Sequence, residues 1–289
     1  MEKPILRLEN VTHVYSQGTP FEMTAIHDIN FEVRPGEVIG IIGHTGSGKS
    51  TLIQHLNGLI KPTGGAVFFD GADINSSKQN IKNVRSKVGL VFQYPEYQLF
   101  EETVYKDIAF GPKNMKLPEE EISKRVREAA GFVGIGAELM EKSPFELSGG
   151  QKRRIAIAGV IAMMPQVLVL DEPMAGLDPV GRGDIMRNLM SYHDATGAAL
   201  IIVTHSMEDA ARYADRMIVL NRGAVAMDGT PEEVFSRGDE LETMGLTVPA
   251  MTKLASELKR RGVKLEGTIY TIEQMKTALL GLKGGVRRA

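Results

Sequence analysis

Residues Gly43 to Ser50 have the types and spacing that bind the phosphates of a nucleotide. They read GHTGSGKS, fit the pattern GxxxxGK(S/T), and stand between the apolar stretch EVIGIIG and the helix-like stretch TLIQHLNGL. In such a loop the backbone N–H groups surround the phosphates, Lys49 contacts the β and γ oxygens, and Ser50 offers its hydroxyl to Mg²⁺. A plain glycine-rich turn is the alternative, and the flanking elements argue against it. The expected phosphate loop comprises Gly43, His44, Thr45, Gly46, Ser47, Gly48, Lys49, Ser50 and Thr51.

Two adjacent carboxylates and one histidine follow other apolar stretches. Asp171 and Glu172 end the stretch VLVLDEP, and His205 ends LIIVTH. Asp171 is expected to hold Mg²⁺, directly or through water, and Glu172 to polarise the water that attacks the terminal phosphate. His205 taken alone would be a solvated surface histidine, but at the mouth of the same sheet we interpret it as a γ-phosphate contact.

A second segment, FELSGGQKRRIAIAGV, also contains residues that hold anions. Ser148, Gly149, Gly150 and Gln151 open an expected helix, and glycines there allow a phosphate to approach the backbone. Ser148 is also a natural helix N-cap, so a purely structural role is the alternative. Because the phosphate loop already provides one site, we predict that this second segment serves a phosphate bound to another molecule.

Three apolar stretches must position these groups, because each ends at one of the motifs. EVIGIIG (37–43), QVLVLDEP (166–173) and AALIIVTH (198–205) are almost continuously apolar, as parallel strands covered on both faces are. Ligands bind beyond the carboxyl ends of such strands, so the three motifs are expected to meet at one site. From Ile5 to Phe69 apolar residues alternate with polar ones in places, which predicts half-buried antiparallel strands.

The rest of the chain has a helical pattern in two places. Residues about 95–164 are interpreted as a helical insert, and the compact pattern ends near Phe235. We therefore expect a nucleotide-binding domain over residues 1–235 and a C-terminal helical extension over 236–289, which is too small to fold alone. Helical stripes are predicted at Ile122, Val126, Ala129 and Val133, at Met251, Leu254, Ala255 and Leu258, and at Ile272, Met275 and Leu279.

Composition excludes several function classes. The chain has 289 residues, 43% of them hydrophobic, and a net charge of -2, with one short basic run KRR, so nucleic acid is a poor candidate partner. Because there is no cysteine, disulfides and thiolate metal sites are excluded. The longest apolar run, IAIAGVIAMM, has about half of the ~20 residues that span a bilayer. Any membrane association is therefore expected to go through another chain.

Five motifs, in this order, resemble the nucleotide-binding subunits of ABC transporters: GHTGSGKST, LSGGQ, VLVLDEP, AGLDP and VTH. The resemblance covers about residues 6–235. It implies an α/β P-loop NTPase cassette, with a parallel-sheet core, an antiparallel β subdomain and a helical insert, that binds ATP and Mg²⁺ and hydrolyses ATP. In that family two cassettes dimerise head to tail, and each ATP lies between the phosphate loop of one and the LSGGQ signature of the other.

Further roles are implied only by this resemblance. Tyr15 matches the aromatic residue that stacks on adenine, and Gln93 in GLVFQYPE matches the glutamine that links Mg²⁺ and the water to the membrane partner. Asp178 matches the acidic residue of the loop that communicates across the dimer, whereas Met174 departs from the usual Thr or Ser, with little effect expected. The implied catalytic residues are Glu172, His205 and Gln93, the implied metal ligands are Ser50, Gln93 and Asp171, and the signature contacts are Ser148, Gly149, Gly150 and Gln151.

Two longer stretches narrow the resemblance to the energy-coupling factor (ECF) subfamily, including its cobalt-type members. They are YPEYQLFEETVYKDIAFGPKN and GLTVPAMTKLASELKRRG, and the loop SQGTPFEMTA together with GHTGSGKST resembles the second, A-prime, ATPase of that subfamily. The resemblance implies a heterodimer of ATPases at the cytoplasmic face of the cell membrane. A transmembrane scaffold protein and a small substrate-capturing membrane protein complete the importer, which takes up a vitamin or a metal ion that another subunit selects.

Other interpretations are less well supported. ABC-type ATPases that act on DNA or ribosomes carry long coiled coils or two cassettes with basic linkers, and neither is present. A nucleotide sensor without turnover would lack Glu172 or His205. A soluble ABC-class ATPase without a membrane partner is the main alternative. In the importer, Glu96, Glu101 and Glu102, which have no obvious local basic partner, are expected to meet arginines of the scaffold protein.

Overall fold

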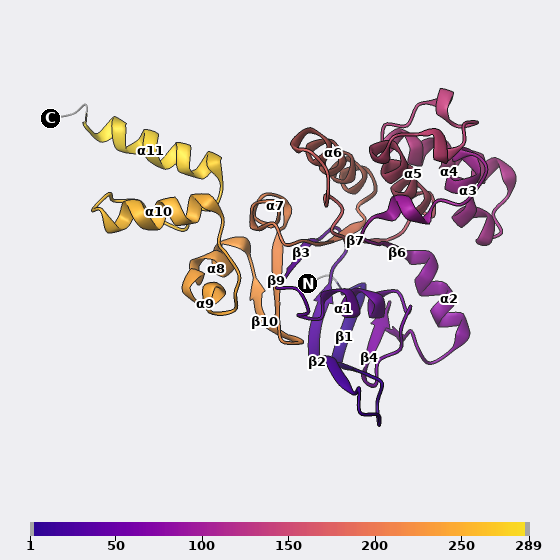
Figure 1. The fold of residues 1–289 in the computed structure, drawn as a ribbon, viewed down its shortest axis with the longest axis horizontal. Helices are drawn as coiled ribbons and strands as arrows, with labels where there is room; N and C mark the ends of the chain where they lie inside the picture. The colour runs from indigo at the N-terminus through magenta and orange to yellow at the C-terminus, as the bar shows by residue number, and fades with distance from the viewer. Residues whose placement is uncertain (1–2, 287–289) are drawn as a thin grey trace.

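The computed structural model describes residues 3–286, which form two β-sheets, helices around the larger sheet, and a helical C-terminal arm that extends away from it (Figure 1). The larger sheet has the order β10-β9-β3-β8-β7-β6, from β3 (Val38–Ile42), β6 (Val88–Val91), β7 (Val167–Asp171), β8 (Ala199–Val203), β9 (Arg216–Asn221) and β10 (Ala224–Gly229). The smaller sheet has the order β2-β1-β4-β5, from β1 (Leu6–Tyr15), β2 (Met23–Val33), β4 (Gly64–Phe69) and β5 (Ala72–Asp73).

The larger sheet is parallel from β9 to β6, with antiparallel β10 at its edge. Every residue of β3, β7 and β8 is buried, because elements pack on both faces, and this confirms the parallel strands predicted from their continuous apolar sequence. β9 pairs with antiparallel β10. It also pairs in parallel with β3, where Arg216 lies opposite Ile39.

The smaller sheet shows the predicted alternation. Leu6 and Leu8 of β1 are buried, and Leu8 lies opposite Phe31 of antiparallel β2. These side chains share one hydrophobic core with Ile39 and Ile41 of β3, so the two sheets are joined by apolar packing around α1 (Lys49–Leu56). The helix that follows the phosphate loop is therefore packed in the core that the two sheets share.

The helical insert packs on the other face of the larger sheet. It contains α3 (Val104–Asn114), α4 (Glu119–Phe132) and α5 (Gly149–Ile161) with three short 3-10 helices, η1 (Pro95–Gln98), η2 (Ala137–Leu139) and η3 (Pro144–Glu146), and it follows α2 (Lys78–Lys87). The predicted stripe Ile122, Val126, Ala129 and Val133 is buried, in one core with α6 (Pro179–Thr196). Met174, which replaces the usual Thr or Ser, is 4% exposed in that core, so an apolar side chain suits its position.

Packing continues beyond Phe235 into the C-terminal extension. The remaining helices are α7 (Met207–Tyr213), α8 (Pro231–Ser236), α9 (Gly238–Thr243), α10 (Ala250–Arg260) and α11 (Ile272–Val286). Phe235 shares a core with Met207 of α7 and with Leu246 and Val248, which lie between α9 and α10. The extension therefore begins as part of the same packed body as α7.

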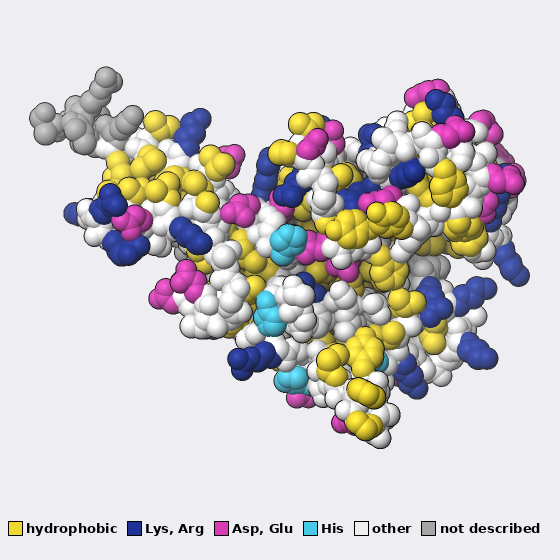
Figure 2. Space-filling model, in the orientation of Figure 1, with side chains coloured by type: hydrophobic (Ala, Val, Ile, Leu, Met, Phe, Trp, Pro, Cys, Tyr) yellow, Lys and Arg dark blue, Asp and Glu magenta, His cyan; other side chains and the backbone are white. Residues whose placement is uncertain are grey.

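The predicted apolar stripes of α10 and α11 are only partly buried within the chain. Ala255 and Met275 lie in a small core between the two helices, but Leu254 is 41% and Ile272 68% exposed. Figure 2 shows apolar side chains gathered over these two helices. The stripes thus hold more apolar surface than the contact between α10 and α11 covers.

Arg153 of α5 joins three parts of the molecule although its side chain is only 2% exposed. Its Nε and Nη2 donate to the two carboxylate oxygens of Glu96 in η1, at 3.0 and 3.1 Å. Its Nη1 donates to the carbonyl oxygens of Pro173, at 3.4 Å, and Ala175, at 2.5 Å. Because a buried guanidinium needs partners for all its donors, this set fixes α5 against both η1 and the loop after Glu172.

Arg153→Met should lower the free energy of unfolding by about 3 kcal/mol, because Glu96 and two carbonyl oxygens would lose their donor in a largely buried place. Urea unfolding followed by circular dichroism measures this. Arg154→Met, at the next and less buried position, is the matched control and should change stability by no more than about 0.5 kcal/mol. Equal losses in the two variants would show that the Arg153 contacts do not stabilise the fold.

Candidate functional site

A cavity of about 740 Å³ lies at the carboxyl ends of β3, β7 and β8 and brings together most of the predicted site. Gln93, Asp171, Glu172 and His205 line it together with the phosphate loop. The loop residues on its wall are Gly43, His44, Thr45, Gly46, Gly48, Lys49, Ser50 and Thr51. Motifs separated by more than a hundred residues in the sequence therefore share one space.

Steric limits explain the glycines of the phosphate loop. A Cβ at Gly43 would lie 2.4 Å from the carbonyl oxygen of Leu220 and 2.5 Å from Ser47 Oγ. Gly48 has φ +103° and would place a Cβ 2.6 Å from Ile26, so neither position accepts a side chain. Ser47 also belongs to the phosphate loop, but it is 1% exposed and does not line the cavity.

Lys49 lies across the phosphate loop. Its Nζ donates to the carbonyl oxygens of Gly43, at 2.6 Å, and His44, at 2.9 Å. Burial lowers the pKa of Lys49, and the negative charges of Glu172 and Asp171 act in the opposite direction. The two carboxylates therefore help to keep the ammonium group charged where phosphate oxygens would be bound.

Ser50 and Asp171 converge as oxygen ligands of a cation would. Ser50 Oγ donates to Asp171 Oδ2 at 3.4 Å, and Gln93 lines the same cavity. Burial, and then the nearby charge of Glu172, raises the pKa of Asp171, whereas the Ser50 hydroxyl and the charge of Lys49 act in the opposite direction. Oxygen donors of this kind suit Mg²⁺, which usually takes one or two protein ligands and completes its shell with phosphates and water.

Glu172 and His205 are paired at the cavity wall. His205 Nδ1 lies 2.9 Å from Glu172 Oε2, and the Glu172 side chain is 13% exposed whereas that of His205 is 75% exposed. Glu172 has φ +49°, in the left-handed region that side chains other than glycine seldom adopt. Its backbone N–H donates to the carbonyl oxygen of Val203 at 2.9 Å, so pairing with β8 holds this conformation in place.

Tyr15 does not line this cavity but is tied to the helix behind it. Its hydroxyl lies 3.3 Å from Thr51 Oγ1, and its ring stands edge-on to His13, with centroids 4.5 Å apart. His13 in turn contacts His55, whose pKa burial lowers to about 4 and whose Nδ1 lies 2.7 Å from the Thr51 carbonyl oxygen. Neutral His55 can therefore donate from Nδ1 to the Thr51 carbonyl oxygen, and its ring packs against that of His13.

The signature segment lies outside the cavity and caps α5. Ser148 Oγ accepts from Gln151 N–H, and the Gln151 side chain accepts from Ser148 N–H, which is a reciprocal capping box. The predicted N-cap is confirmed, and Gln151 has a structural role that the sequence interpretation did not assign to it. Gly149 and Gly150 differ, because a Cβ at either would meet no atom within 4 Å. The packing of this chain therefore does not require glycine there.

Asp178 is also separate from the cavity. Its side chain caps α6 by accepting from Gly181 N–H at 2.7 Å, and the residue is exposed. Together with exposed Ser148 and Gly149, it forms part of the surface rather than the wall of this chain's phosphate site.

Several cavity residues were not expected from the sequence. Met23, Thr24 and Ala25 follow the loop SQGTPF, which no phosphate-binding pattern covers. Met207 and the turn Gly245–Thr247 also line the cavity, although the turn lies about two hundred residues from the phosphate loop. A short polar turn without a motif carries no local signal of such a role.

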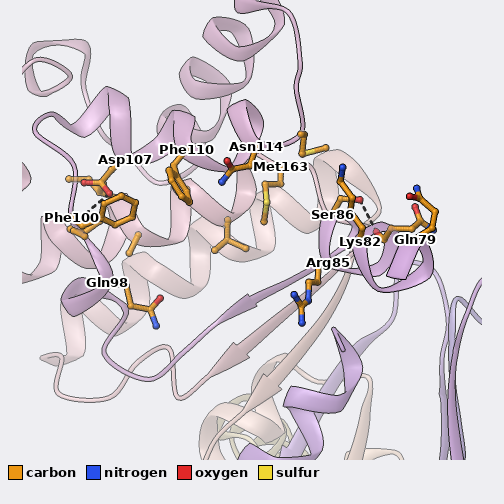
Figure 3. Close-up of a pocket in the computed structure, with 18 residues that line it drawn as sticks. Gln79, Lys82, Arg85, Ser86, Gln98, Phe100, Asp107, Phe110, Asn114 and Met163 are labelled. Atoms are coloured by element: carbon orange, nitrogen blue, oxygen red, sulfur yellow. Dashed lines mark hydrogen bonds between the residues drawn. The ribbon is translucent and has the colours of Figure 1, made fainter. Parts of the chain in front are cut away.

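A second cavity of about 740 Å³ forms a groove between α2, α3 and α5 (Figure 3). Phe100 and Phe110, whose rings meet edge-on with centroids 4.9 Å apart, form one side, and Lys82 and Arg85 of α2 face them. Asp107 accepts from the backbone N–H groups of Phe100, at 3.4 Å, and Glu101, at 3.2 Å, while burial raises the pKa of Asp107. The groove is thus mainly apolar with polar ends.

The expectation that three glutamates near Gln93 lack local basic partners is wrong for Glu102, and Glu96 has a basic partner from a distant part of the chain. Glu96 binds Arg153 through both carboxylate oxygens, and Glu102 binds Lys106 at 2.5 Å. Arg153 is distant from Glu96 in sequence, so only the fold shows that pair, whereas Lys106 lies four residues after Glu102. Within residues 3–286, Glu101 is the member of this group for which no ion pair is found.

The chain is similar in sequence to known proteins. The family described as "ABC transporter" matches residues 26–175. The chain is 55% identical over 282 residues to "Energy-coupling factor transporter ATP-binding protein EcfA2" of Caldanaerobacter subterraneus subsp. tengcongensis, covering 98% of this chain and 99% of that protein. It is also 55% identical over 276 residues to the Clostridium tetani protein of the same name, covering 95% and 96%.

Solved structures show the same architecture. CbiO1 from Clostridium perfringens, described as part of the ABC transporter complex cbiONQ, has a TM-score of 0.75 and 41% identity, covering 89% of this chain and 100% of that one. The ATP-binding cassette MJ0796, solved as a dimer in a post-hydrolysis state bound to ADP and Pi, has a TM-score of 0.69 and 30% identity. The match covers 78% of this chain and 98% of the MJ0796 chain.

Glu172→Gln should lower nucleoside triphosphate hydrolysis by about 10²–10⁴-fold while leaving nucleotide binding intact, because it removes a base and keeps the phosphate loop and Asp171. Steady-state phosphate release, measured with the partner subunits present, and equilibrium binding test the two halves of this statement. Glu128→Gln on the exposed side of α4 is the control for loss of one carboxylate. Undiminished hydrolysis in Glu172→Gln would remove Glu172 from the catalytic role.

Proposed function

The chain belongs to the ABC transporter family as an ATP-hydrolysing subunit of the ECF type, and we propose that it powers uptake of a vitamin or a metal ion through membrane partners. The observation that carries this proposal is the convergence of Lys49, Asp171, Glu172 and His205 on one cavity. A cation, two carboxylates with separate environments and an exposed histidine are the groups that phosphoryl transfer to water requires.

Each side chain has a distinct part in the proposed reaction. Lys49 and the backbone N–H groups of the phosphate loop bind the phosphates, and Glu172 orients and polarises the attacking water. The pairing of Glu172 with His205 holds both groups at the γ-phosphate end of the site. Ser50, Asp171 and Gln93 would hold Mg²⁺, which neutralises charge that develops on the phosphate oxygens.

The proposed ligands of Mg²⁺ combine three kinds of oxygen donor, from Ser50, Gln93 and Asp171. Among residues 3–286 no group of three or more His, Cys, Asp and Glu side chains is arranged to bind a metal ion. A cation held by one carboxylate, one hydroxyl and one amide would therefore depend on bound phosphate for the rest of its ligands. Nucleotide and Mg²⁺ are thus expected to bind together.

We further propose that a second ATPase completes the site. Ser148 and Gly149 are exposed, and no packing within the chain explains Gly149 or Gly150. Glycines at a helix N-terminus allow a phosphate to approach backbone N–H groups closely. In the proposed arrangement these groups face ATP on the phosphate loop of a partner ATPase, which we expect to be a related but different chain, and Asp178 contacts the same partner.

Membrane partners are proposed to bind the groove between α2, α3 and α5. Phe100 is 59% and Phe110 43% exposed, which is unusual for large aromatic side chains that face one cavity. A short amphipathic helix of a transmembrane scaffold protein would cover them, and an arginine on that helix would meet Glu101. Gln93 of the catalytic cavity precedes η1 in the chain and Phe100 of the groove follows it, so η1 connects the two, and movement of such a helix would reach the cavity through it.

Location and domain organisation are part of the same proposal. Over residues 3–286 no helix has the length and apolar character needed to cross a membrane. We propose that the chain is held at the cytoplasmic face of the cell membrane by its partners, with residues 1–235 as the ATPase domain and 236–289 as a helical extension. The transported substrate would be selected by a separate substrate-capturing membrane protein.

Ser148→Asp should block closure of the dimer, because it keeps the helix cap but places a negative charge beside the partner's γ-phosphate. Ser148→Asn has nearly the same size, also caps the helix and carries no charge, so it is the matched control. Hydrolysis by the assembled complex should fall strongly only in Ser148→Asp. ATP affinity of the isolated chain should be unchanged, and a loss of binding comparable to that of Lys49→Ala would mean that Ser148 serves this chain's own site.

Phe100→Asp should prevent assembly with the membrane partners, because it puts a charge into the surface that would be buried by the scaffold helix. Co-purification of the other subunits from detergent-solubilised membranes measures assembly, and ATP binding by the isolated variant checks its fold. Phe21→Asp changes an aromatic residue that is 84% exposed outside the groove and is the control. Normal assembly of Phe100→Asp would contradict the groove as the docking site.

A further inference from the structure

The turn between α9 and α10 has a rigid backbone conformation. Gly245 has φ +74°, and its N–H donates to the Glu242 carbonyl oxygen at 3.0 Å. The N–H of Leu246 donates to the Leu241 carbonyl oxygen at 2.9 Å. These two bonds form a Schellman motif, and its usual apolar contact is present because Leu241 and Leu246 lie in one core. Thr247, the next residue, is therefore placed by a fixed turn, and it is exposed.

This turn packs against α7, the short helix that follows His205. Met207 begins α7 and packs in one core with Leu246, and Glu208 Oε1 accepts from the N–H of Ala250, the first residue of α10, at 3.2 Å. Figure 1 shows α7 between the larger sheet and the helices of the extension. The histidine at the phosphate end of the site and the start of the extension thus share one support.

Thr247 faces the cavity that holds the phosphate loop. Gly245, Leu246 and Thr247 line this cavity together with Lys49 and His205, although no phosphate-binding motif includes them. Leu246 is 7% exposed and fills the core, whereas Thr247 is exposed, so its hydroxyl is the side-chain polar group that the turn offers to an occupant of the cavity. A hydroxyl can donate to a phosphate or sugar oxygen without adding charge to a site that already contains Lys49.

We propose that Thr247 is a contact of the nucleotide bound at this chain's own phosphate loop, so that the C-terminal extension supplies one wall of the ATP site. This inference rests on the proposed ATP-binding function. ATP in the cavity touches the turn, and the turn is continuous with α10, which packs against α11. The extension thereby responds to the occupancy of the site through Leu246 and the Glu208–Ala250 hydrogen bond.

Thiol protection in the full-length chain tests this contact directly. The protein has no cysteine, so Thr247→Cys carries a single thiol and needs no further substitution. Its rate of alkylation is measured with and without ATP, after ATP binding by the same variant has been measured by equilibrium dialysis. Ser256→Cys, on the exposed side of α10 and not on the cavity wall, is the matched control.

The proposal predicts that ATP at about ten times its measured Kd slows alkylation of Thr247→Cys about tenfold, because about a tenth of the sites remain free. Alkylation of Ser256→Cys should not change. Protection of the thiol should be the same when the protein concentration is lowered tenfold, because it arises within one chain. If protection disappears on dilution, a second chain covers Thr247, and the proposal is overturned. Bound ATP without protection would overturn it as well, with the proposed function intact.

Affinity measurements supply a second readout. Thr247→Val keeps the shape of the side chain and removes the hydroxyl, and it should weaken ATP binding about two- to tenfold, as expected for one neutral hydrogen bond. Thr243→Val, on α9 and outside the cavity, should leave affinity unchanged. Equal affinities in Thr247→Val and the unchanged protein would exclude the contact. A chain that binds no ATP at all would instead contradict the proposed function and this inference together.

Discussion

The arrangement of the molecule depends on one buried guanidinium. Arg153 binds both oxygens of Glu96 and the carbonyl oxygens of Pro173 and Ala175, and its guanidinium carbon lies 5.8 Å from the ring centre of Tyr94. Pro173 follows Glu172 and Tyr94 follows Gln93, so α5 is attached to the two loops that bring these residues into the cavity. A lysine could supply the charge but not the planar set of donors that reaches all these acceptors.

Strand ends provide the second constraint, because chemistry occurs where the regular hydrogen bonding of the parallel sheet stops. Asp171 closes β7, and Glu172 turns out of the strand with φ +49° while its N–H still pairs with Val203 of β8. The strain of this conformation is opposed by burial of the whole of β7 and β8. The carboxylate beside His205 is therefore held by the sheet rather than by a flexible loop.

Much of the site could be predicted from the sequence because its signals are local. A glycine loop between strand and helix, acidic residues after VLVLD and a histidine after LIIVT each need only neighbouring residues to be interpreted. The Arg153–Glu96 pair, the pairing of β9 with β3 and the position of Thr247 depend on residues that lie far apart in the chain. Gln151 shows the converse, because its capping role is local and the spacing of Ser148 and Gln151 is itself a signal for it.

The phosphate loop and the segment that opens α5 make unequal use of glycine. At Gly43 and Gly48 a side chain would collide with the protein itself, whereas at Gly149 and Gly150 it would meet open space. The first pair is therefore required by the fold, and the second has a reason only if something from outside approaches α5. Arg153 lies on this same helix, so α5 is linked through its hydrogen bonds to the loop after Glu172. In a dimer built as proposed, a structural change at one ATP site would thus be transmitted through α5 to the other ATP site.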